Sequence, residues 1–284
     1  MAVTTRFAPS PTGYLHLGHA YAAGIAWRRA RSEGGSFLLR LEDIDPKRCR
    51  ADFAEAILED LAWLGLDWDG VVRVQSLHLP AYRAALERLA GRRLLYPCFC
   101  SRAEILREVA GAAAAPHDPD GAPLYPGTCR ALSAAERAGR IAAGAPHAWR
   151  LDMAAARQQA GALSFHEENE GEITCHPEQF GDVVLARRDI AASYHLCVTH
   201  DDAAQGVTLV TRGIDIKPST HLHRLLQALL GWPTPRYAHH PLLTGADGNR
   251  LSKRDGAATL RALRDAGLSA AAIWNQVREK SRLF

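Results

Sequence analysis

The sequence lacks a long apolar run, an apolar leader and a dense set of cysteines. No stretch approaches the roughly 20 uncharged apolar residues that a membrane span requires, and residues 1–6 form no apolar signal region. The six cysteines of the 284-residue chain lie far apart except for one close pair, which favours reduced thiols over disulfides. These absences predict a cytoplasmic globular protein without membrane contact, and the length allows about two domains.

Lysine is also scarce. Of the 34 basic residues only four are lysines, at positions 47, 217, 253 and 280, so the other 30 (34 minus 4) are arginines. A GC-rich coding bias explains this composition, but a lysine placed between arginines, as Lys253 is, still suggests a functional role. The formal net charge of +3 neither requires nor excludes an RNA partner, because a basic stripe can lie within a nearly neutral total.

The N-terminal part alternates strand and helix signals. A short strand is expected at 3–7, a loop with two prolines and a glycine at 8–13, a helix at about 15–30 and a buried strand at 36–41. A further helix is expected to begin with Asp52 as its N-cap. This order is typical of a parallel α/β sheet.

The pattern changes after Leu95, where an insertion is expected to begin. It contains a low-complexity loop at 111–123 and short strands such as 148–152. Apolar strand signals then return, and we expect them to re-enter the first sheet; they lie at 183–185, 194–199 and 207–211. Beyond Pro218 the chain is expected to be mainly helical, apart from a hairpin-like segment at 242–251 with its turn at 247–248.

Three short segments contain residues suited to a phosphorylated ligand. The first is Arg6 to Gly13, followed by His16-Leu-Gly-His19 at the expected helix start, where N–H groups and the helix dipole favour an anion. The two histidines would share one face of the first turn. Considered alone, such a pair is more often an ordinary surface or capping feature.

The other two segments are Arg250-Leu-Ser-Lys-Arg254 and Leu41-Glu-Asp-Ile-Asp45. Lys253 is a mobile point charge that can follow a phosphate during reaction, although a solvated basic loop is the simpler reading. The carboxylates of Glu42, Asp43 and Asp45 follow an expected strand, and such positions point into the ligand crevice of an open parallel sheet. Acids that merely cap a helix are the alternative.

Together these segments resemble the catalytic domain of the glutamyl- and glutaminyl-tRNA synthetases. That family has His-Ile-Gly-His and Lys-Met-Ser-Lys-Ser motifs, which stand here as His16-Leu-Gly-His19 and Arg250-Leu-Ser-Lys-Arg254. Other family-like segments follow in order, namely Phe37–Asp43, Leu61–Asp67, Tyr194–Asp202 and Thr211–Asp215. The resemblance, over residues 4–265, implies an α/β fold with the Rossmann-like nucleotide-binding parallel sheet of class I aminoacyl-tRNA synthetases.

The resemblance also implies a domain organisation. Residues 1–95 and 181–217 would form the two halves of the catalytic domain, 96–180 an inserted α+β subdomain with zinc, and 218–284 a helical region that includes the loop at 250–254. No anticodon-binding domain is expected, because only 30 residues follow Arg254.

The short form is similar to the glutamyl-Q tRNA(Asp) synthetases. In that family L-glutamate is activated with ATP and Mg²⁺ and esterified to queuosine at the anticodon wobble position of tRNA(Asp). The resemblance therefore implies an ATP-dependent ligase, expected as a monomer, with glutamate, ATP and queuosine-containing tRNA(Asp) as partners. The alternatives are a truncated glutamyl-tRNA synthetase that charges the tRNA 3′ end, and a non-catalytic RNA-binding paralogue.

The resemblance assigns roles to residues of this chain. His16 and His19 would bind ATP phosphates and Lys253 would follow the leaving pyrophosphate, with Pro9 and Gly18 also at the ATP site. Arg6, Arg212 or both would pair with a substrate carboxylate, since guanidinium gives bidentate contacts. The remaining glutamate-site residues are Phe7, Ala8, Pro9, Ser10, Glu42 and Tyr194, of which Ser10 and Glu42 match residues that hold the α-amino group.

Three thiols in the insertion are candidate metal ligands. Cys98 and Cys100 are followed by Cys129, and such soft ligands suit tetrahedral zinc, although a lone Cys-x-Cys is more often two ordinary cysteines. The resemblance makes Tyr125 the fourth ligand, because the short family uses a tyrosine and a cysteine four residues apart. His117, Asp118 and Asp120 are the alternatives for that fourth position.

Overall fold

Two groups of mainly parallel strands form the centre of the protein. The computed structural model describes residues 2–110, 117–187, 189–243 and 258–281. The first group is β1-β2-β3, all parallel; in the second, β6, β10 and β9 are parallel and β7 is antiparallel at the edge. Their bounds are Thr4–Phe7 (β1), Ser36–Leu41 (β2), Arg73–Val74 (β3), Ser164–Glu167 (β6), Gly171–Thr174 (β7), Leu209–Gly213 (β9) and Arg236–His240 (β10).

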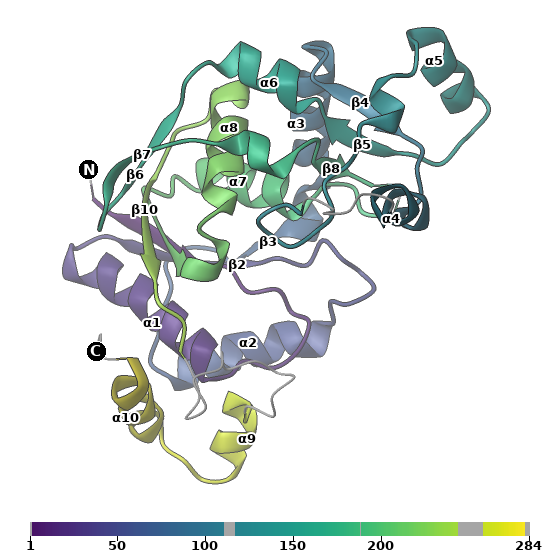
Figure 1. The fold of residues 1–284 in the computed structure, drawn as a ribbon. Coiled ribbons are helices and arrows are strands. Elements are labelled where there is room, and N and C mark those ends of the chain that lie inside the picture. The colour runs from purple at the N-terminus through teal and green to yellow at the C-terminus, as the bar shows by residue number, and fades with distance from the viewer. Residues whose placement is uncertain (1, 111–116, 188, 244–257, 282–284) are drawn as a thin grey trace.

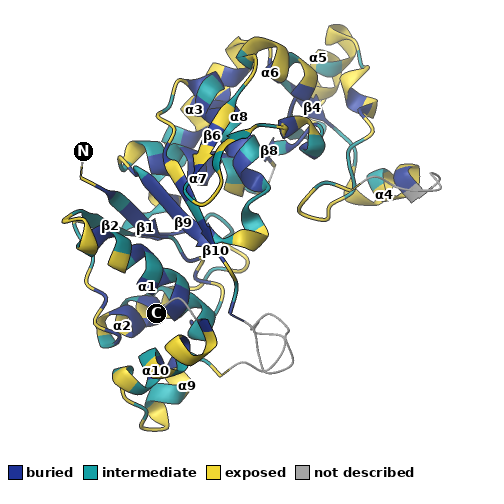
Figure 2. Cartoon of the chain, turned by 60° about the vertical axis from the view of Figure 1, so that its left-hand side comes forward, coloured by how far each residue is buried: buried dark blue, intermediate teal, exposed yellow. Residues whose placement is uncertain are grey.

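The two groups meet between β1 and β9. The Thr208 N–H donates to the Thr4 carbonyl oxygen at 3.0 Å, and the Thr4 N–H donates to the Thr208 hydroxyl at 2.9 Å. Figure 2 shows β2, β1, β9 and β10 side by side across this join. The chain continues from β1 to β2 on one side of the join and from β9 to β10 on the other, away from the join in each case. Open α/β sheets bind ligands at the carboxyl ends of the strands beside such a switch point.

Helices cover both faces of the strands (Figure 1). On one face α1 (Leu17–Ser32) and α2 (Ala51–Trp63) share an apolar core with β1, β2 and the C-terminal helix α10 (Ala270–Ser281). On the other, a second core unites four helices, α3 (Leu79–Gly91), α6 (Met153–Ala160), α7 (Tyr194–Ala204) and α8 (Ser219–Leu230). The remaining helices are α4 (Arg102–Ala110), α5 (Ala134–Ala142) and α9 (Leu260–Asp265).

Small side chains let α1 lie close to β1. Ala20, Ala23 and Ala26 are buried on the face of α1 that meets the strands. The approach is close enough for the Thr5 hydroxyl on β1 to donate to the Ala26 carbonyl oxygen at 2.8 Å. This packing fixes the start of α1 at the carboxyl end of β1, where the candidate site lies.

A third, antiparallel sheet contains β4 (Leu95–Cys98), β5 (Ala148–Leu151) and β8 (Val184–Ala186). The strand expected at 148–152 is therefore present. The strand expected at 183–185 is also present, but the prediction that it re-enters the first sheet is wrong, because β8 pairs with β5 instead. Conversely, β6 belongs to the expected insertion by sequence and pairs with β10. The domain boundaries themselves stay a prediction.

The segment 194–199 is a second correction, since it begins helix α7 and is not a strand. The Ser193 hydroxyl caps this helix by accepting the Leu196 N–H at 3.4 Å. Burial explains the error: α7 is enclosed on most sides, so its apolar residues show no helical period that could be distinguished from a short buried strand.

The start of α2 is a third correction. Asp52 does not cap the helix; the N-cap position is Arg50, which makes no side-chain cap bond. The Asp52 carboxylate instead accepts two hydrogen bonds from the Arg50 guanidinium, at 3.0 and 2.8 Å. The local ion pair thus takes the side chain away from the helix N–H groups.

The expected hairpin at 242–251 lies largely outside the described residues, as does its turn at 247–248. Among the residues that the structure describes, no helix is long and apolar enough to cross a membrane.

Candidate active site

The carboxyl ends of β1 and β9 open into a cavity of about 390 Å³. Its walls come from the loop after β1, the first turn of α1, the end of β2 and the start of α7. Nine of the predicted site residues line it, namely Phe7, Ala8, Pro9, Ser10, His16, Gly18, His19, Glu42 and Tyr194. The fold thus brings together residues from four separate parts of the chain.

His16 and His19 form the N-terminal cap of α1. The Gly18 N–H donates to His16 Nδ1 and the His16 N–H donates to His19 Nδ1, both at 3.1 Å. Because Nδ1 accepts in each ring, Nε2 carries the proton in the neutral form. A Cβ at residue 18 would lie 2.9 Å from His16 Cε1, so glycine is needed for this ring position. The two rings are therefore oriented by the backbone that they cap.

Arg6 precedes Phe7 on β1, is not among the residues that line the cavity and is paired with a carboxylate. Its Nε is 3.0 Å from Asp202 Oδ1, and its NH1 donates to the Thr211 carbonyl oxygen at 3.1 Å. The same Asp202 oxygen accepts from Arg40 NH1 at 2.9 Å, and Arg40 is fully buried. Burial alone would raise the pKa of Asp202, but the two guanidinium groups outweigh it and lower that pKa.

Glu42 follows β2 and faces both the cavity and this network. Burial raises its pKa to about 7, although Arg40 and Arg6 oppose the rise. Its backbone N–H donates to the Pro9 carbonyl oxygen at 3.0 Å, which fixes the loop after β1 against the end of β2. Glu42 is consequently a buried carboxyl group poised between its neutral and charged forms near pH 7.

Arg212, on β9, has a different environment from Arg6. It is 6% exposed, and its three hydrogen-bond acceptors are all uncharged groups. Nε donates to His239 Nε2 at 3.1 Å, NH1 to His223 Nδ1 at 3.1 Å and NH2 to Thr220 Oγ1 at 2.7 Å. No carboxylate of the described chain forms an ion pair with it. A buried guanidinium without a counter-ion favours an anionic ligand.

The histidines around Arg212 are neutral. Burial, reinforced by the nearby Arg212, lowers the pKa of His223 well below its ordinary value and the pKa of His195 to about 4. The pKa of His239 is lowered for the same two reasons. His239 Nδ1 lies 2.6 Å from Glu167 Oε2, so the carboxylate fixes which ring nitrogen carries the proton.

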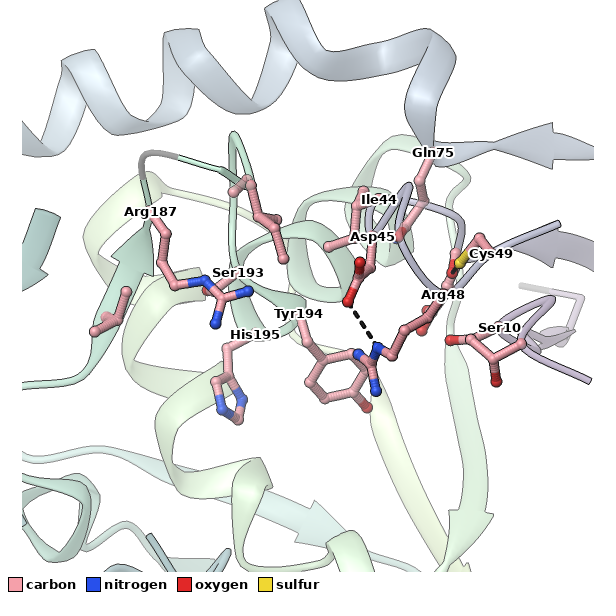
Figure 3. A pocket seen from close by; sticks show the side chains of 15 residues that line it. Ser10, Ile44, Asp45, Arg48, Cys49, Gln75, Arg187, Ser193, Tyr194 and His195 are labelled. Carbon is pink, nitrogen blue, oxygen red and sulfur yellow. Dashed lines mark hydrogen bonds and ion pairs between the residues drawn. The ribbon is translucent and has the colours of Figure 1, made fainter. Parts of the chain in front are cut away.

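A second cavity of about 450 Å³ adjoins the first. The two share Ser10, Thr12, Glu42 and Tyr194 in their walls. Figure 3 shows Arg48 and Arg187 on opposite sides of this second cavity, with the rings of Tyr194 and His195 below them. Arg48 is held by Asp45, at 2.7 Å from Nε to Oδ2. The site therefore has a second compartment, with two ion-paired arginines in its walls, beside the one that the predicted residues line.

The three predicted thiols do come together. The Sγ atoms of Cys98, Cys100 and Cys129 lie within 4.8 Å of one another. Tyr125 Oη is 3.5 Å from Cys100 Sγ and accepts the Cys129 N–H at 2.8 Å. Asp120 lies elsewhere, facing His195 at 3.6 Å. Three thiols and a phenol at these positions are a donor set that could hold a tetrahedral soft metal ion.

Lys253 and the rest of the segment 250–254 lie outside the described residues. Sequence reasoning missed several buried partners of the site, namely Arg40, Glu167, Thr220, His223 and His239. Two signals could have found them: an arginine inside the apolar strand 36–41, and the histidines at 221, 223, 239 and 240 that follow Arg212 along the chain.

The comparisons with known proteins agree with this fold. The model of the catalytic domain of class I tRNA synthetases (E and Q) matches residues 2–280. The chain therefore belongs to this family, and the predictions of a class I synthetase fold and of a ligase-type enzyme are confirmed. A glutamate–tRNA synthetase structure from Elizabethkingia anophelis superposes with a TM-score of 0.81 at 27% identity, covering 98% of this chain and 61% of that one.

Within the family, the similarity extends to the short members. A Glutamyl-Q tRNA(Asp) synthetase from Rhodobacter capsulatus is 48% identical over 279 residues, 95% of this chain and 97% of that protein. A Glutamate–tRNA ligase from Aquifex aeolicus is 40% identical over 274 residues, which are 96% of this chain and 56% of the ligase. The chain thus spans a little over half of the longer ligases and nearly all of the short relative.

Proposed function

We propose that the protein activates L-glutamate with ATP and transfers the glutamyl group to queuosine in the anticodon of tRNA(Asp). The observation that carries the proposal is Arg212, a buried guanidinium whose protein partners are all neutral. An acidic substrate side chain would supply the missing counter-ion, and a neutral amide would not. The similarity over nearly the whole length of a Glutamyl-Q tRNA(Asp) synthetase supports the choice of acceptor.

In this proposal glutamate lies across the join between β1 and β9. Arg212 pairs with the side-chain carboxylate, Tyr194 donates a hydrogen bond to it, and Arg6 contributes from the neighbouring strand. Ser10 and Glu42 hold the α-amino group, with Glu42 in its charged form when the ammonium is present. The backbone of Phe7, Ala8 and Pro9 forms the adjacent wall.

ATP is proposed to bind at the start of α1. His16 and His19 would direct their Nε2–H groups at phosphate oxygens, and Pro9 and Gly18 would line the same surface. A glutamate carboxylate oxygen attacks the α-phosphorus, the bond to the bridging oxygen breaks, and pyrophosphate leaves. Lys253 is proposed to follow the leaving pyrophosphate, as the family resemblance implies. Mg²⁺ bound to the phosphates would offset their charge, so the protein mainly orients two anions.

The second cavity is suited to the RNA acceptor. A hydroxyl oxygen of the queuosine cyclopentenediol would attack the acyl carbon of the adenylate, AMP would leave, and the hydroxyl proton would be released. Arg48 and Arg187 stand where they can contact an RNA backbone. The wall shared by the two cavities brings the acceptor within reach of an adenylate bound in the first.

The thiol cluster is proposed to bind one structural Zn²⁺ through Cys98, Cys100, Cys129 and Tyr125. The Arg150 guanidinium carbon lies 3.9 Å from the Tyr125 ring centre. Burial nevertheless raises the pKa of Tyr125, so the charge of the bound ion would have to stabilise the phenolate form that a metal ligand requires. The ion would join β4 to the segment that contains Tyr125 and Cys129.

The test uses tRNA(Asp) from which the 3′ adenosine has been removed, prepared with and without queuosine. With ATP, Mg²⁺ and labelled glutamate, label is expected only in the queuosine-containing RNA. Label on intact tRNA(Glu) alone would identify a 3′-end ligase and overturn the proposed acceptor. No glutamate-dependent ATP–pyrophosphate exchange, with or without RNA, would favour a non-catalytic RNA-binding protein.

A further inference from the structure

Two hydrogen bonds lead from Arg212 through His223 to His195, which faces Asp120 at the surface. Arg212 NH1 contacts His223 Nδ1 at 3.1 Å, and His223 Nε2 contacts His195 Nδ1, also at 3.1 Å. His195 Nε2 then faces the Asp120 carboxylate at 3.6 Å. His223 is 3% exposed, whereas Asp120 lies at the surface. None of the catalytic roles proposed above involves His223, His195 or Asp120.

The direction of each proton in the chain follows from the donor at its inner end and agrees with the carboxylate at its outer end. A guanidinium only donates, so His223 Nδ1 must accept, and in a neutral ring Nε2 then carries the proton. His223 Nε2–H can donate only if His195 Nδ1 accepts, which leaves the remaining proton on His195 Nε2. That N–H faces a carboxylate, which only accepts. A ring flipped at either position would set two donors or two acceptors against each other.

The same logic holds on the other side of Arg212. His239 Nε2 accepts from Nε while His239 Nδ1 faces Glu167. Arginine has five N–H donors, and three of them are taken by His239, His223 and Thr220, which leaves two. Two N–H groups on one guanidinium match the two oxygens of a carboxylate, whereas an amide would bring an NH₂ donor against them.

We propose that His223 and His195 are positioning residues that set the preference of this site for an acidic over an amide side chain. They do so by keeping an acceptor directed at Arg212, and Asp120 sets the direction of the chain from its outer end. The inference rests on the proposed activation of glutamate, and it adds residues that act on glutamate through Arg212. Asp120 also accepts from the Ser219 hydroxyl at 3.3 Å, which ties the insertion to the start of α8.

A matched pair of substitutions at one position tests the proposal. In His223→Asn the amide oxygen can replace Nδ1 and still accept from Arg212; in His223→Gln the amide reaches the Nε2 position and Arg212 loses its acceptor. We expect His223→Gln to lower the glutamate-to-glutamine ratio of kcat/KM by about 10- to 100-fold in ATP–pyrophosphate exchange. His223→Asn should stay within about threefold of wild type, and the KM for ATP should not change in either.

Asp120→Asn tests the outer end, because an amide can donate to His195 and allow the chain to reverse. Its expected effect is a smaller fall in the same ratio. Glu178→Gln is the control, since Glu178 also stands beside a histidine, His176, but has no connection to Arg212. Equal effects of His223→Asn and His223→Gln, with equal losses of thermal stability, would indicate a purely structural role and overturn the proposal.

A second readout does not depend on activity. Nitrogen-15 NMR of the histidine rings in the wild-type protein should show His223 and His195 protonated at Nε2 and His239 at Nδ1. The opposite form at His223 would overturn the inference. Wild-type protein without glutamate-dependent exchange would overturn the proposed function, whereas normal exchange with an unchanged ratio in His223→Gln would overturn the inference alone.

Discussion

Arg6 and Arg212 lie on neighbouring strands across the same join, are almost equally buried and have opposite environments. Arg6 shares the Asp202 carboxylate with Arg40, so its charge is already neutralised by the protein. Arg212 is surrounded by two neutral histidines and a threonine. The difference separates a guanidinium that already has a protein counter-ion from one that has none among the described residues. The residue types alone could not make that distinction.

Removal of the shared carboxylate should have the largest effect. Asp202→Asn leaves Arg6 and Arg40 buried without their common partner, and breaking such a pair costs about 3–5 kcal/mol of unfolding free energy. Urea denaturation measures this directly. Asp189→Asn, which removes an exposed carboxylate near Arg187, is the control and should leave the midpoint unchanged. If the denaturation midpoint of Asp202→Asn changed as little as that of the control, the contrast between Arg6 and Arg212 would be wrong.

Arg212→Gln should show the reverse pattern. Because no carboxylate is left unpaired, we expect a smaller loss of unfolding free energy than in Asp202→Asn, although Gln supplies only two N–H donors for the three acceptors that Arg212 satisfies. The kcat/KM for glutamate in ATP–pyrophosphate exchange should fall by about 100- to 1,000-fold, since a buried charge partner of the substrate is lost. A strongly destabilised variant with near-normal exchange would assign Arg212 to the fold and contradict the comparison.

Removal of the metal ion should not change the environments of Arg6 and Arg212. If the thiol cluster binds zinc, Zn²⁺ at 100 times its dissociation constant adds about 2.7 kcal/mol to the unfolding free energy, and a chelator reverses it. Cys129→Ser should abolish that increment, while the KM for glutamate changes little. Metal analysis of the purified protein gives the stoichiometry, and one ion per chain is expected. Stabilisation that persists in Cys129→Ser would locate the ion elsewhere.

The smallest expected effect concerns Glu42, on the Arg6 side of the pocket. Its pKa in the folded protein is about 7, so the ionised form that attracts an ammonium group increases as the pH rises through 7. The affinity for glutamate, measured by calorimetry without ATP, should rise about tenfold from pH 6 to pH 8. Glu42→Gln should bind more weakly, with a flat profile between those limits; a steep profile would assign the titration to another group.

The contribution of Glu42 to folding stability changes with pH in the opposite direction to the affinity for glutamate. Because folding raises the pKa of Glu42, the folded state retains this proton better than the unfolded chain does. The contribution of Glu42 to stability is therefore present below its unfolded pKa and is lost as the pH rises towards 7.

The sequence predicted the first half of the fold well because its strands and helices alternate with clear loops. It failed at α7, where burial on most sides removes the helical period, and at β8, whose partner β5 is set by long-range pairing that no local pattern encodes. The lining of the site was predictable from short motifs. The histidines behind Arg212 were not, because their role arises only when β9, α8 and β10 pack together.

The join between β1 and β9 has a mechanical consequence. Its described bonds include backbone and hydroxyl contacts between Thr4 and Thr208 and a bond from the Arg6 side chain to the Thr211 carbonyl oxygen, while the two strand groups remain separate sheets. A ligand that contacts residues of both groups would therefore connect the two sheets. Bound substrates would limit sliding of the two sheets relative to each other. The reactants would thus make the site that orients them more rigid.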